Sequence, residues 1–429
     1  MRKSDCGFTH QLIFFVQEDF FHMSDSVQKT AERPEKVRLW NRDFVLIIFI
    51  NFLVFMNHLM ILSTFPFYIE YLGGSNTVAG LATAGFSIIA ILLRPVIGWL
   101  LDTGRRRGVL LAGLVLMALM PLGYLFLAVL YLAFICRMLH GAALALSNTS
   151  TATVATDIIP KERFAEGMGY FGLATAMATA VAPAFGLALM NKVGYGALFI
   201  AAFLCAAVSI VLLLCMHVPK PQRVERKFSL KGMIDRDALP ASVTALSFLF
   251  TYGALENFVA KYAANANLPS GGLFFTVMAV FLLLTRLTAG RVTDRHGEGI
   301  FAYSCNFAMM AAVLLLGLVP GKATFFLAAV LAGFGFGGLE PALQSMAVAI
   351  APPERRGAAN STFLCAYDIG IGLGGAVAGV LIDAVGYGHM YTIMAVFNVI
   401  SVLFYTFVGR NHPSSFSYRL RHGDIPQAK

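Results

Sequence analysis

Charged residues are scarce in this chain of 429 residues, where Asp, Glu, Lys and Arg together make up 13%. Soluble domains contain about twice that share. The six cysteines form no C-x-x-C pair, and the chain has no H-E-x-x-H motif and no phosphate-binding glycine loop. These absences argue against a soluble enzyme. We therefore expect no enzyme activity, no cofactor, no metal site and no disulfide.

Apolar residues are correspondingly abundant, at 58% of the chain. Long runs without charge cover residues 44–66, 77–93, 108–136 and 196–216. A helix needs about 20 residues to cross the hydrocarbon core of a bilayer. The sequence therefore predicts an all-α integral membrane protein with many spans.

Twelve spans are predicted when the same rule is applied along the chain. They are 44–68, 77–101, 108–126, 129–156, 165–190, 196–217, 241–263, 271–293, 299–319, 323–350, 358–383 and 389–409. The boundary between the third and fourth spans has no polar loop and depends on Pro121, Gly123 and length.

Basic residues are distributed very unevenly between the two sides of these spans. The two tails and alternate loops carry 26 of the 32 Lys and Arg residues, whereas the other loops carry only Lys192, Lys261 and Lys322. The positive-inside rule then predicts a plasma (inner) membrane protein with both termini in the cytoplasm. Anionic lipid accounts for the net charge of +9, so no nucleic-acid partner is expected.

The first 22 residues do not resemble a secretory signal. Their apolar stretch is only 12–16, and it is followed by Glu18 and Asp19. Because a polar stretch follows Met23, our hypothesis is that residues 1–22 are an upstream extension.

The chain contains an internal repeat with an offset of 192 residues. The matched pairs are Arg94 with Arg286, Gly98 with Gly290, Asp102 with Asp294, Pro160 with Pro352, Glu162 with Glu354 and Arg163 with Arg355. This register predicts two six-helix halves in the same orientation. The predicted parts are an N-terminal tail (1–43), a first bundle (44–217), a linker (218–240), a second bundle (241–409) and a C-terminal tail (410–429).

The repeated loops carry the resemblance to a family. Gly98-x-x-x-Asp102 followed by Arg105, Arg106 and Arg107, and Gly290-x-x-x-Asp294-Arg295, resemble the signature loops of the major facilitator superfamily, a family of transporters built from two parallel halves. Arg137-x-x-His140-Gly141 is similar to its second motif. Pro183 and Gly186 partly match the motif associated with its antiporters.

The resemblance implies a switch at these loops. Asp102 would accept hydrogen bonds from the start of span eleven, near 357–360, with Arg106 or Arg107 screening it, and Asp294 with Arg295 would act in the same way on span five. Such contacts would form only when the halves close on the inner side. Alternatively, these residues are ordinary charges at the ends of spans.

Charges within spans are costly, so they tend to face a cavity or a partner. For Arg94 and Arg286 we favour side chains that extend to the inner interface. Arg137 lies deeper and is the best candidate for a cavity residue, either in proton movement or in substrate binding. The alternative for Arg137 is a structural bond to a backbone carbonyl.

Three carboxylates lie well inside spans: Glu256, Glu340 and Asp368. An acid exposed alternately to two solutions can take up a proton on one side and release it on the other. Glu340 could instead satisfy the break at Pro341, and Asp368 could bond to a neighbouring helix. Glu256 could lie near enough to the outer surface to be hydrated.

Span one adds Asn57 and His58 as candidates. They are adjacent, so at most one points straight into a central cavity. A lone histidine in a membrane more often makes a packing hydrogen bond. His140, one turn from Arg137, has the same two interpretations.

The leading functional hypothesis is an alternating-access carrier that exports small amphipathic or polar organic compounds in exchange for protons. Its expected partners are a small-molecule substrate, protons and the lipid bilayer, and it is expected to work as a monomer. A proton symporter or facilitator that imports a metabolite is the main alternative. A membrane scaffold without transport activity is a remote one.

Overall fold

The computed structural model describes residues 39–160, 163–219, 234–352 and 355–423. Within these ranges the chain is helical and contains no strand. The long helices are α2 (Arg42–Tyr71), α3 (Asn76–Asp102), α4 (Arg106–Phe126), α5 (Leu130–Ile158), α6 (Phe164–Lys192), α7 (Tyr195–Cys215), α8 (Leu239–Asn265), α9 (Gly271–His296), α10 (Gly299–Leu318), α11 (Lys322–Val348) and α12 (Arg356–Phe407). The short helices η3 (Gly409–Asn411) and α13 (Phe416–Arg421) follow. The hypothesis about residues 1–22 lies outside the described residues.

Helix α12 is two membrane spans joined by a break. Gly386, with φ 81° and ψ 170°, interrupts the helical geometry, so residues 356–385 and 387–407 form separate segments. Only glycine adopts such a conformation without steric cost. Each of the other ten long helices is long and apolar enough to cross a membrane. With α12 counted as two, the described residues form the twelve spans that the sequence predicts.

The sequence sets several helix ends through local hydrogen bonds. The side chain of Asn41 accepts from the backbone N–H of Phe44 at 2.8 Å and begins α2. Ser75 begins α3 in the same way through the N–H of Val78. Such caps satisfy the amides that a first helical turn leaves unpaired. The loop between α2 and α3 is therefore short and well defined.

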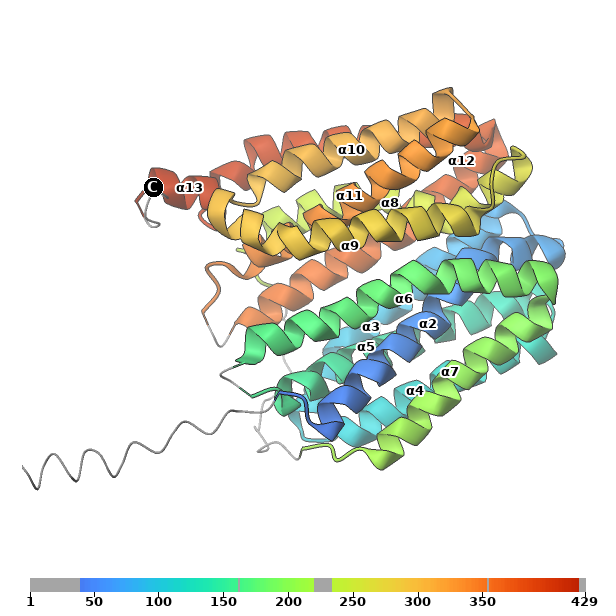
Figure 1. Ribbon diagram of the computed structural model, residues 1–429, viewed down its shortest axis with the longest axis horizontal. Coiled ribbons are helices and arrows are strands. Elements are labelled where there is room, and N and C mark those ends of the chain that lie inside the picture. The colour runs from blue at the N-terminus through green and yellow to red at the C-terminus, as the bar shows by residue number, and fades with distance from the viewer. Residues whose placement is uncertain (1–38, 161–162, 220–233, 353–354, 424–429) are drawn as a thin grey trace, which may run out of the picture.

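The helices form two bundles that lie side by side (Figure 1). The first half contains α2–α7 and the second half contains α8–α12. Across the boundary, α3 packs on α12, α6 on α9, and α2 on α8. These three helix pairs are the surfaces that must slide or separate if the halves move.

The two ends of the bundle differ, and we name them for use below. The basic end carries the α3–α4 turn and the α9–α10 turn, and lies at the left of Figure 1 with α13. The far end carries the α2–α3 turn and the α8–α9 turn. Between the ends, helix faces expose large apolar side chains suited to lipid, among them Phe49, Leu92, Leu119, Val211, Leu284 and Leu403.

Candidate transport site

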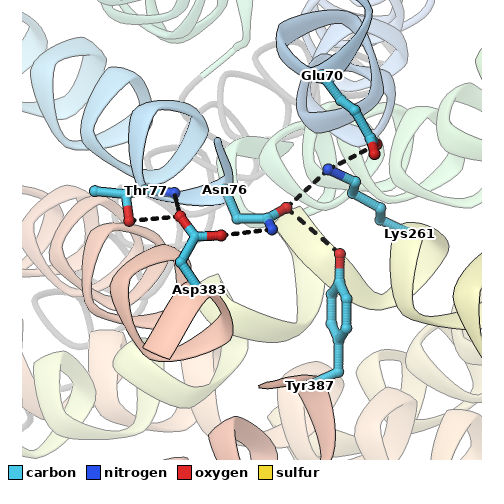
Figure 2. Close-up of polar contacts among 6 residues, drawn as sticks. All are labelled: Glu70, Asn76, Thr77, Lys261, Asp383 and Tyr387. Atoms are coloured by element: carbon cyan, nitrogen blue, oxygen red, sulfur yellow. Dashed lines mark hydrogen bonds and ion pairs between the residues drawn. The ribbon is translucent and has the colours of Figure 1, made fainter. Parts of the chain in front are cut away.

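A polar cluster joins the two halves at the far end (Figure 2). We call it the far-end clasp, and it consists of Glu70, Asn76, Thr77, Lys261, Asp383 and Tyr387. Asp383 lies near the end of the first segment of α12 and accepts from three donors at the start of α3. They are the Asn76 Nδ2 at 2.8 Å, the Thr77 backbone N–H at 2.7 Å and the Thr77 hydroxyl at 2.7 Å. A carboxylate is stabilised here because it faces the positive end of a helix dipole.

Lys261 of α8 forms the other part of the far-end clasp. Its Nζ lies 2.8 Å from Glu70 Oε2 at the end of α2 and donates to Asn76 Oδ1, also at 2.8 Å. The hydroxyl of Tyr387 donates to the same Asn76 oxygen at 3.4 Å. Asn76 therefore connects Lys261 and Tyr387 with Asp383. The result is one continuous network over four helices.

Below the far-end clasp the two halves pack closely. A Cβ on Gly80 of α3 would collide with the backbone of α12, and one on Gly379 of α12 would collide with the backbone at Asn76. Thr83 Oγ1 donates to Asn257 Oδ1 of α8 at 3.0 Å. The absence of side chains at both glycines allows this approach. The far end is thus closed in this conformation.

The halves separate toward the basic end, where a crevice of about 640 Å³ lies between α6 and α9. Its wall is mainly apolar, and its charged members are Glu166, Arg286 and Arg291. The remaining lining residues are Met168, Gly169, Tyr170, Gly172, Leu173, Ala176, Leu283 and Leu287. The molecule is therefore closed at one end and open at the other.

One buried ion pair crosses between the halves. The Nε of Arg94, on α3, donates to Asp368 Oδ2 of α12 at 2.8 Å, and its second nitrogen lies 2.7 Å from the same oxygen. Both side chains are largely buried, with exposed fractions of 12% and 17%. Mutual attraction compensates the burial of the two charges. Loss of one partner leaves the other charge buried and unpaired, which strongly destabilises the folded protein.

A second pair lies within the second half. Arg286 of α9 contacts Glu340 Oε2 of α11 at 2.5 Å. Arg94 and Arg286, which the sequence predicts to extend to the inner interface, thus each pair with a carboxylate in this conformation. Both arginines have a carboxylate partner within reach, and pairing compensates burial more fully than partial hydration does. The two arginines occupy equivalent positions in the second helix of each half, α3 and α9. Their carboxylate partners come from helices that are not equivalent, α12 for Arg94 and α11 for Arg286.

Arg137 is fully buried on α5. Its guanidinium lies over the rings of Phe65 and Phe86, at 4.8 and 4.7 Å from their centroids. Tyr124 and Glu256 interact with its charge. None of its three side-chain nitrogens has a hydrogen-bond partner of normal geometry among the described residues. The structural alternative, a bond to a backbone carbonyl, is absent from this part of the chain.

Two histidines lie beside Arg137. The ring of His58 stacks on Phe86 at 5.0 Å, and the ring of His140 lies 6.0 Å from that of His58. His140 Nδ1 also lies 3.5 Å from the Tyr124 hydroxyl. His58 therefore points toward the deep arginine and not toward lipid. The sequence suggested these residues separately, and the fold brings them together.

Glu256 approaches the same region from the second half. It is 7% exposed, and its Oε1 accepts from the Tyr252 hydroxyl at 3.3 Å. The Tyr252 ring stacks on Phe336 at 3.9 Å. The possibility that Glu256 is hydrated near the surface does not hold in this conformation. Glu256 instead places a buried carboxylate across from Arg137.

Asn57 bonds to two other helices of the first half. Its Nδ2 donates to the carbonyls of Ala202, at 2.7 Å, and Met117, at 3.3 Å. Both bonds lie inside the first half, where they tie α2 to α7 and α4. The Nδ2 of Asn57 thus joins helices, its Oδ1 is buried without a partner among the described residues, and its role in substrate or proton coupling stays a prediction. His58 is the member of the pair that faces Arg137.

Comparison with known proteins identifies the architecture. A family model described as Major Facilitator Superfamily matches residues 47–269 and again 238–422. The chain belongs to this superfamily. The two matches overlap over residues 238–269 and together span both halves. Members of this family transport small molecules across membranes, and the chain is a transporter and not an enzyme.

Related superfamily members span nearly the full chain. An uncharacterised MFS-type transporter of Burkholderia pseudomallei is 26% identical over 384 residues, which cover 87% of this chain and 94% of that protein. The staphylopine export protein of Staphylococcus aureus is 23% identical over 382 residues, covering 85% and 96%. The chain is similar to both along the length of a complete carrier.

Solved structures of other transporters share the fold at low identity. The nucleoside transporter NupG (D323A mutant) matches with a TM-score of 0.70 and 14% identity, covering 86% of this chain and 100% of the other. A POT family transporter in complex with a thioalcohol-conjugated peptide matches with 0.73 and 15%, covering 87% and 97%. These values establish the architecture. They do not indicate that this chain binds the substrates of those two proteins.

The superfamily signature residues lie at the basic end. Gly98 is in α3 and Gly290 in α9, and a Cβ on either would meet open space. Arg106 forms an ion pair with Asp157 of α5, and Arg107 donates to the Leu214 carbonyl of α7 at 3.3 Å. The side chain of Asp102 lies outside the described residues, so its predicted contact with α12 stays a prediction.

The second signature loop makes no contact with α6 through Asp294 or Arg295 among the described residues. Asp294 and Arg295 are exposed, and no bond joins them to the described part of α6. The predicted contact requires a closed inner side, whereas the crevice between α6 and α9 is at this end. The contact of Asp294 and Arg295 with α6 therefore stays a prediction for the conformation that is closed at the basic end.

The residues of the span-five motif shape the contact between α6 and α2. Pro183 lies within α6, and a Cβ on Gly186 would come within 2.9 Å of the Met60 carbonyl oxygen. These residues therefore set helix packing in the first half. In the described ranges, no group of three His, Cys, Asp or Glu side chains is placed to hold a metal ion.

The far-end clasp was not predicted from the sequence. The charge distribution marks Lys261 only as one of the few bases on its side of the membrane, and residue 383 is only the last position of the predicted span 358–383. A usable signal was present, because Asn76 and Thr77 follow the N-cap Ser75 and so expose helix-start amides to an acid. Which acid reaches them depends on how α12 packs on α3.

Proposed function

We propose that this chain is a proton-coupled carrier that exports small organic compounds by alternating access. The observation that supports this most directly is the Arg94–Asp368 pair, because it joins the two halves within the membrane-spanning region. Protonation of Asp368 would remove the charge that holds Arg94. A proton would thereby change the energy of separating α3 from α12, which is the linkage that coupled transport requires.

The open and closed ends support alternating access. The far-end clasp closes one end while the crevice between α6 and α9 opens the other. By the positive-inside rule the basic end faces the cytoplasm, so this conformation would receive or release substrate on the inner side. The opposite conformation would break the clasp and bring the signature loops against α6 and α12.

Export is the direction that the available comparison favours. The Staphylococcus aureus relative is named as an export protein, and it aligns with 85% of this chain. The span-five motif, here Pro183 and Gly186, also resembles the antiporter motif. A proton symporter or facilitator that imports a metabolite is the second candidate, and it would use the same ion pair with the opposite direction of coupling.

Transport in reconstituted vesicles with an imposed pH gradient tests the proposal. A screen of dyes, drugs, sugars and metallophores would find a compound whose accumulation collapses when the gradient is removed. Asp368→Asn should abolish the response to the gradient. Asp237→Asn is the matched control, since it makes the same change outside the predicted spans.

The outcomes separate the candidates. Antiport predicts that protons and substrate move in opposite directions, whereas symport predicts the same direction. If flux of every transported compound is indifferent to the gradient, proton coupling is wrong, and the chain is a facilitator with the same fold.

A further inference from the structure

Five buried polar atoms that make no hydrogen bond of normal geometry lie close together on α2 and α5, although the Tyr124 hydroxyl lies near enough to Arg137 to interact with it. They are the three side-chain nitrogens of Arg137, Nδ1 of His58 and Nε2 of His140. All three residues are buried, with Arg137 and His140 at 0% exposure and His58 at 7%. We call them the arginine–histidine cluster. Buried polar groups in folded proteins are nearly always hydrogen-bonded, so this concentration calls for an explanation.

Aromatic rings hold the cluster in place. Phe86 of α3 stacks on His58 at 5.0 Å and lies 4.7 Å from the Arg137 guanidinium carbon. Phe65 of α2 lies on a second side of Arg137 at 4.8 Å. The rings orient the guanidinium through cation–π contact and supply no hydrogen-bond acceptor. The N–H groups of Arg137 therefore lack hydrogen-bond acceptors of normal geometry among the described residues.

The chemistry of the cluster selects the missing group. A guanidinium is a permanent cation with five N–H donors in a planar fork, which matches the two oxygens of a carboxylate. Either imidazole can donate one further N–H bond. A planar oxyanion is thus the complement of this set, and the described residues provide none in contact with it.

A carboxylate of the second half faces the cluster without contacting it. Glu256 of α8 interacts with the Arg137 charge, yet no ion pair joins the two among the described residues. Tyr252 donates to Glu256 at 3.3 Å and stacks on Phe336, which gives this side an aromatic floor. A cation is offered by the first half and an anion by the second.

We propose that the arginine–histidine cluster binds the carboxylate of the transported compound, and that Glu256 receives its ammonium group. The substrate class is then an amino-carboxylate zwitterion with an aromatic or apolar body. The inference rests on the proposed transport function and adds the substrate class to it. A zwitterion bridges the two halves through its own charges, so binding would act on the same interface as the Arg94–Asp368 pair.

Binding to the purified full chain tests the class directly. The probes are phenylalanine, tryptophan and histidine, each compared with its methyl ester, which lacks the carboxylate, and its N-acetyl form, which lacks the ammonium. The measurement is the ligand-dependent rise in unfolding temperature in detergent. We expect at least one free amino acid to stabilise the protein more than both of its derivatives, with at least tenfold tighter apparent affinity.

Variants separate binding from a structural role. Arg137→Gln should weaken the affinity for the free amino acid at least tenfold and leave the weak affinity for the ester unchanged. Glu256→Gln should make the free and N-acetyl forms equivalent. Arg410→Gln, at an exposed position on η3, is the control. Size-exclusion chromatography establishes whether each variant is folded. If Arg137→Gln does not fold, His140→Gln is measured instead.

The result that overturns the inference is equally specific. If no free amino acid stabilises the protein more than its derivatives, or if the folded variants retain the preference, the cluster is not a zwitterion site. Gradient-driven flux of a different compound in vesicles would then leave the transport function intact. Zwitterion binding without gradient-driven flux would remove proton coupling and leave the substrate class in place.

Discussion

Asp383 accepts a hydrogen bond of 2.7 Å from the backbone N–H of Thr77, although 306 positions separate the two residues in the chain. The bond joins the end of one half's helix to the beginning of a helix in the other half. It closes the far end by satisfying amides that α3 would otherwise expose to solvent. Opening that end therefore requires water to replace a charge-assisted contact.

Asp383→Ala should shift the protein toward the conformation that is open at the far end. The carboxylate accepts three hydrogen bonds, and a hydrogen bond to a charged group contributes about 1.5–3 kcal/mol, so we expect at least a tenfold change in the conformational equilibrium. A cysteine at position 83 in a cysteine-free background should react faster with an impermeant maleimide. Asp237→Ala is the control. An unchanged rate of labelling in Asp383→Ala would contradict the role of Asp383 in closing the far end.

Lys261 and Glu70 should contribute unequally to stability. The Lys261 side chain is 6% exposed, whereas that of Glu70 is 61% exposed and screened by solvent. Glu70→Gln leaves Lys261 with Asn76 as a partner and should change the unfolding temperature little. Lys261→Met removes both bonds and should lower it clearly. Equal losses from the two variants would show that Glu70 is the main partner.

Arg94 and Asp368 should behave as a pair in a double-mutant cycle. Each single variant, Arg94→Gln or Asp368→Asn, leaves a largely buried charge without its partner, at a cost of about 3–5 kcal/mol. The double variant should recover much of that loss in thermal unfolding, yet remain insensitive to a pH gradient in vesicles. Additive losses would mean that the two side chains do not depend on each other.

Gly379→Val should weaken closure of the far end by a steric route. A Cβ at this position collides with the Asn76 carbonyl, and a branched side chain cannot avoid it. The same labelling assay should report faster reaction, as for Asp383→Ala. Gly108→Val on α4 is the control, because a Cβ there meets open space. A variant labelled at the wild-type rate would show that α3 and α12 are not close in the membrane.

The sequence predicted the architecture well because the membrane imposes it. Length and lack of charge specify each span, and the repeat of Arg94 and Asp102 at Arg286 and Asp294 specifies the two halves. The break at Gly386 also lies between the two predicted final spans. These features depend on local composition or on spacing, and both can be read without knowing which helices touch.

Side-chain partners could not be read in the same way. The partner of Arg94 is Asp368, which lies 274 positions away in the chain. Nothing in the sequence links the two residues, so the predicted role of Arg94 was contact with the membrane interface. Asn57 and His58 were considered together, and only the packing of α2 decides that Asn57 faces α4 and α7. The far-end clasp depends on helices of both halves. Each of these contacts follows from the orientation of one helix about its axis, which apolar periodicity specifies poorly.

Closure at the far end has a thermodynamic consequence beyond that end. If one conformational equilibrium opens one end as it closes the other, as proposed above, any bond that stabilises the present conformation lowers the population of the opposite one by the same factor. Under the proposed mechanism, the bonds of Asp383 and Lys261 therefore set the free energy that a bound compound must supply before the far end opens. Variation at these two positions would tune turnover for every cargo alike, without altering which cargo is chosen.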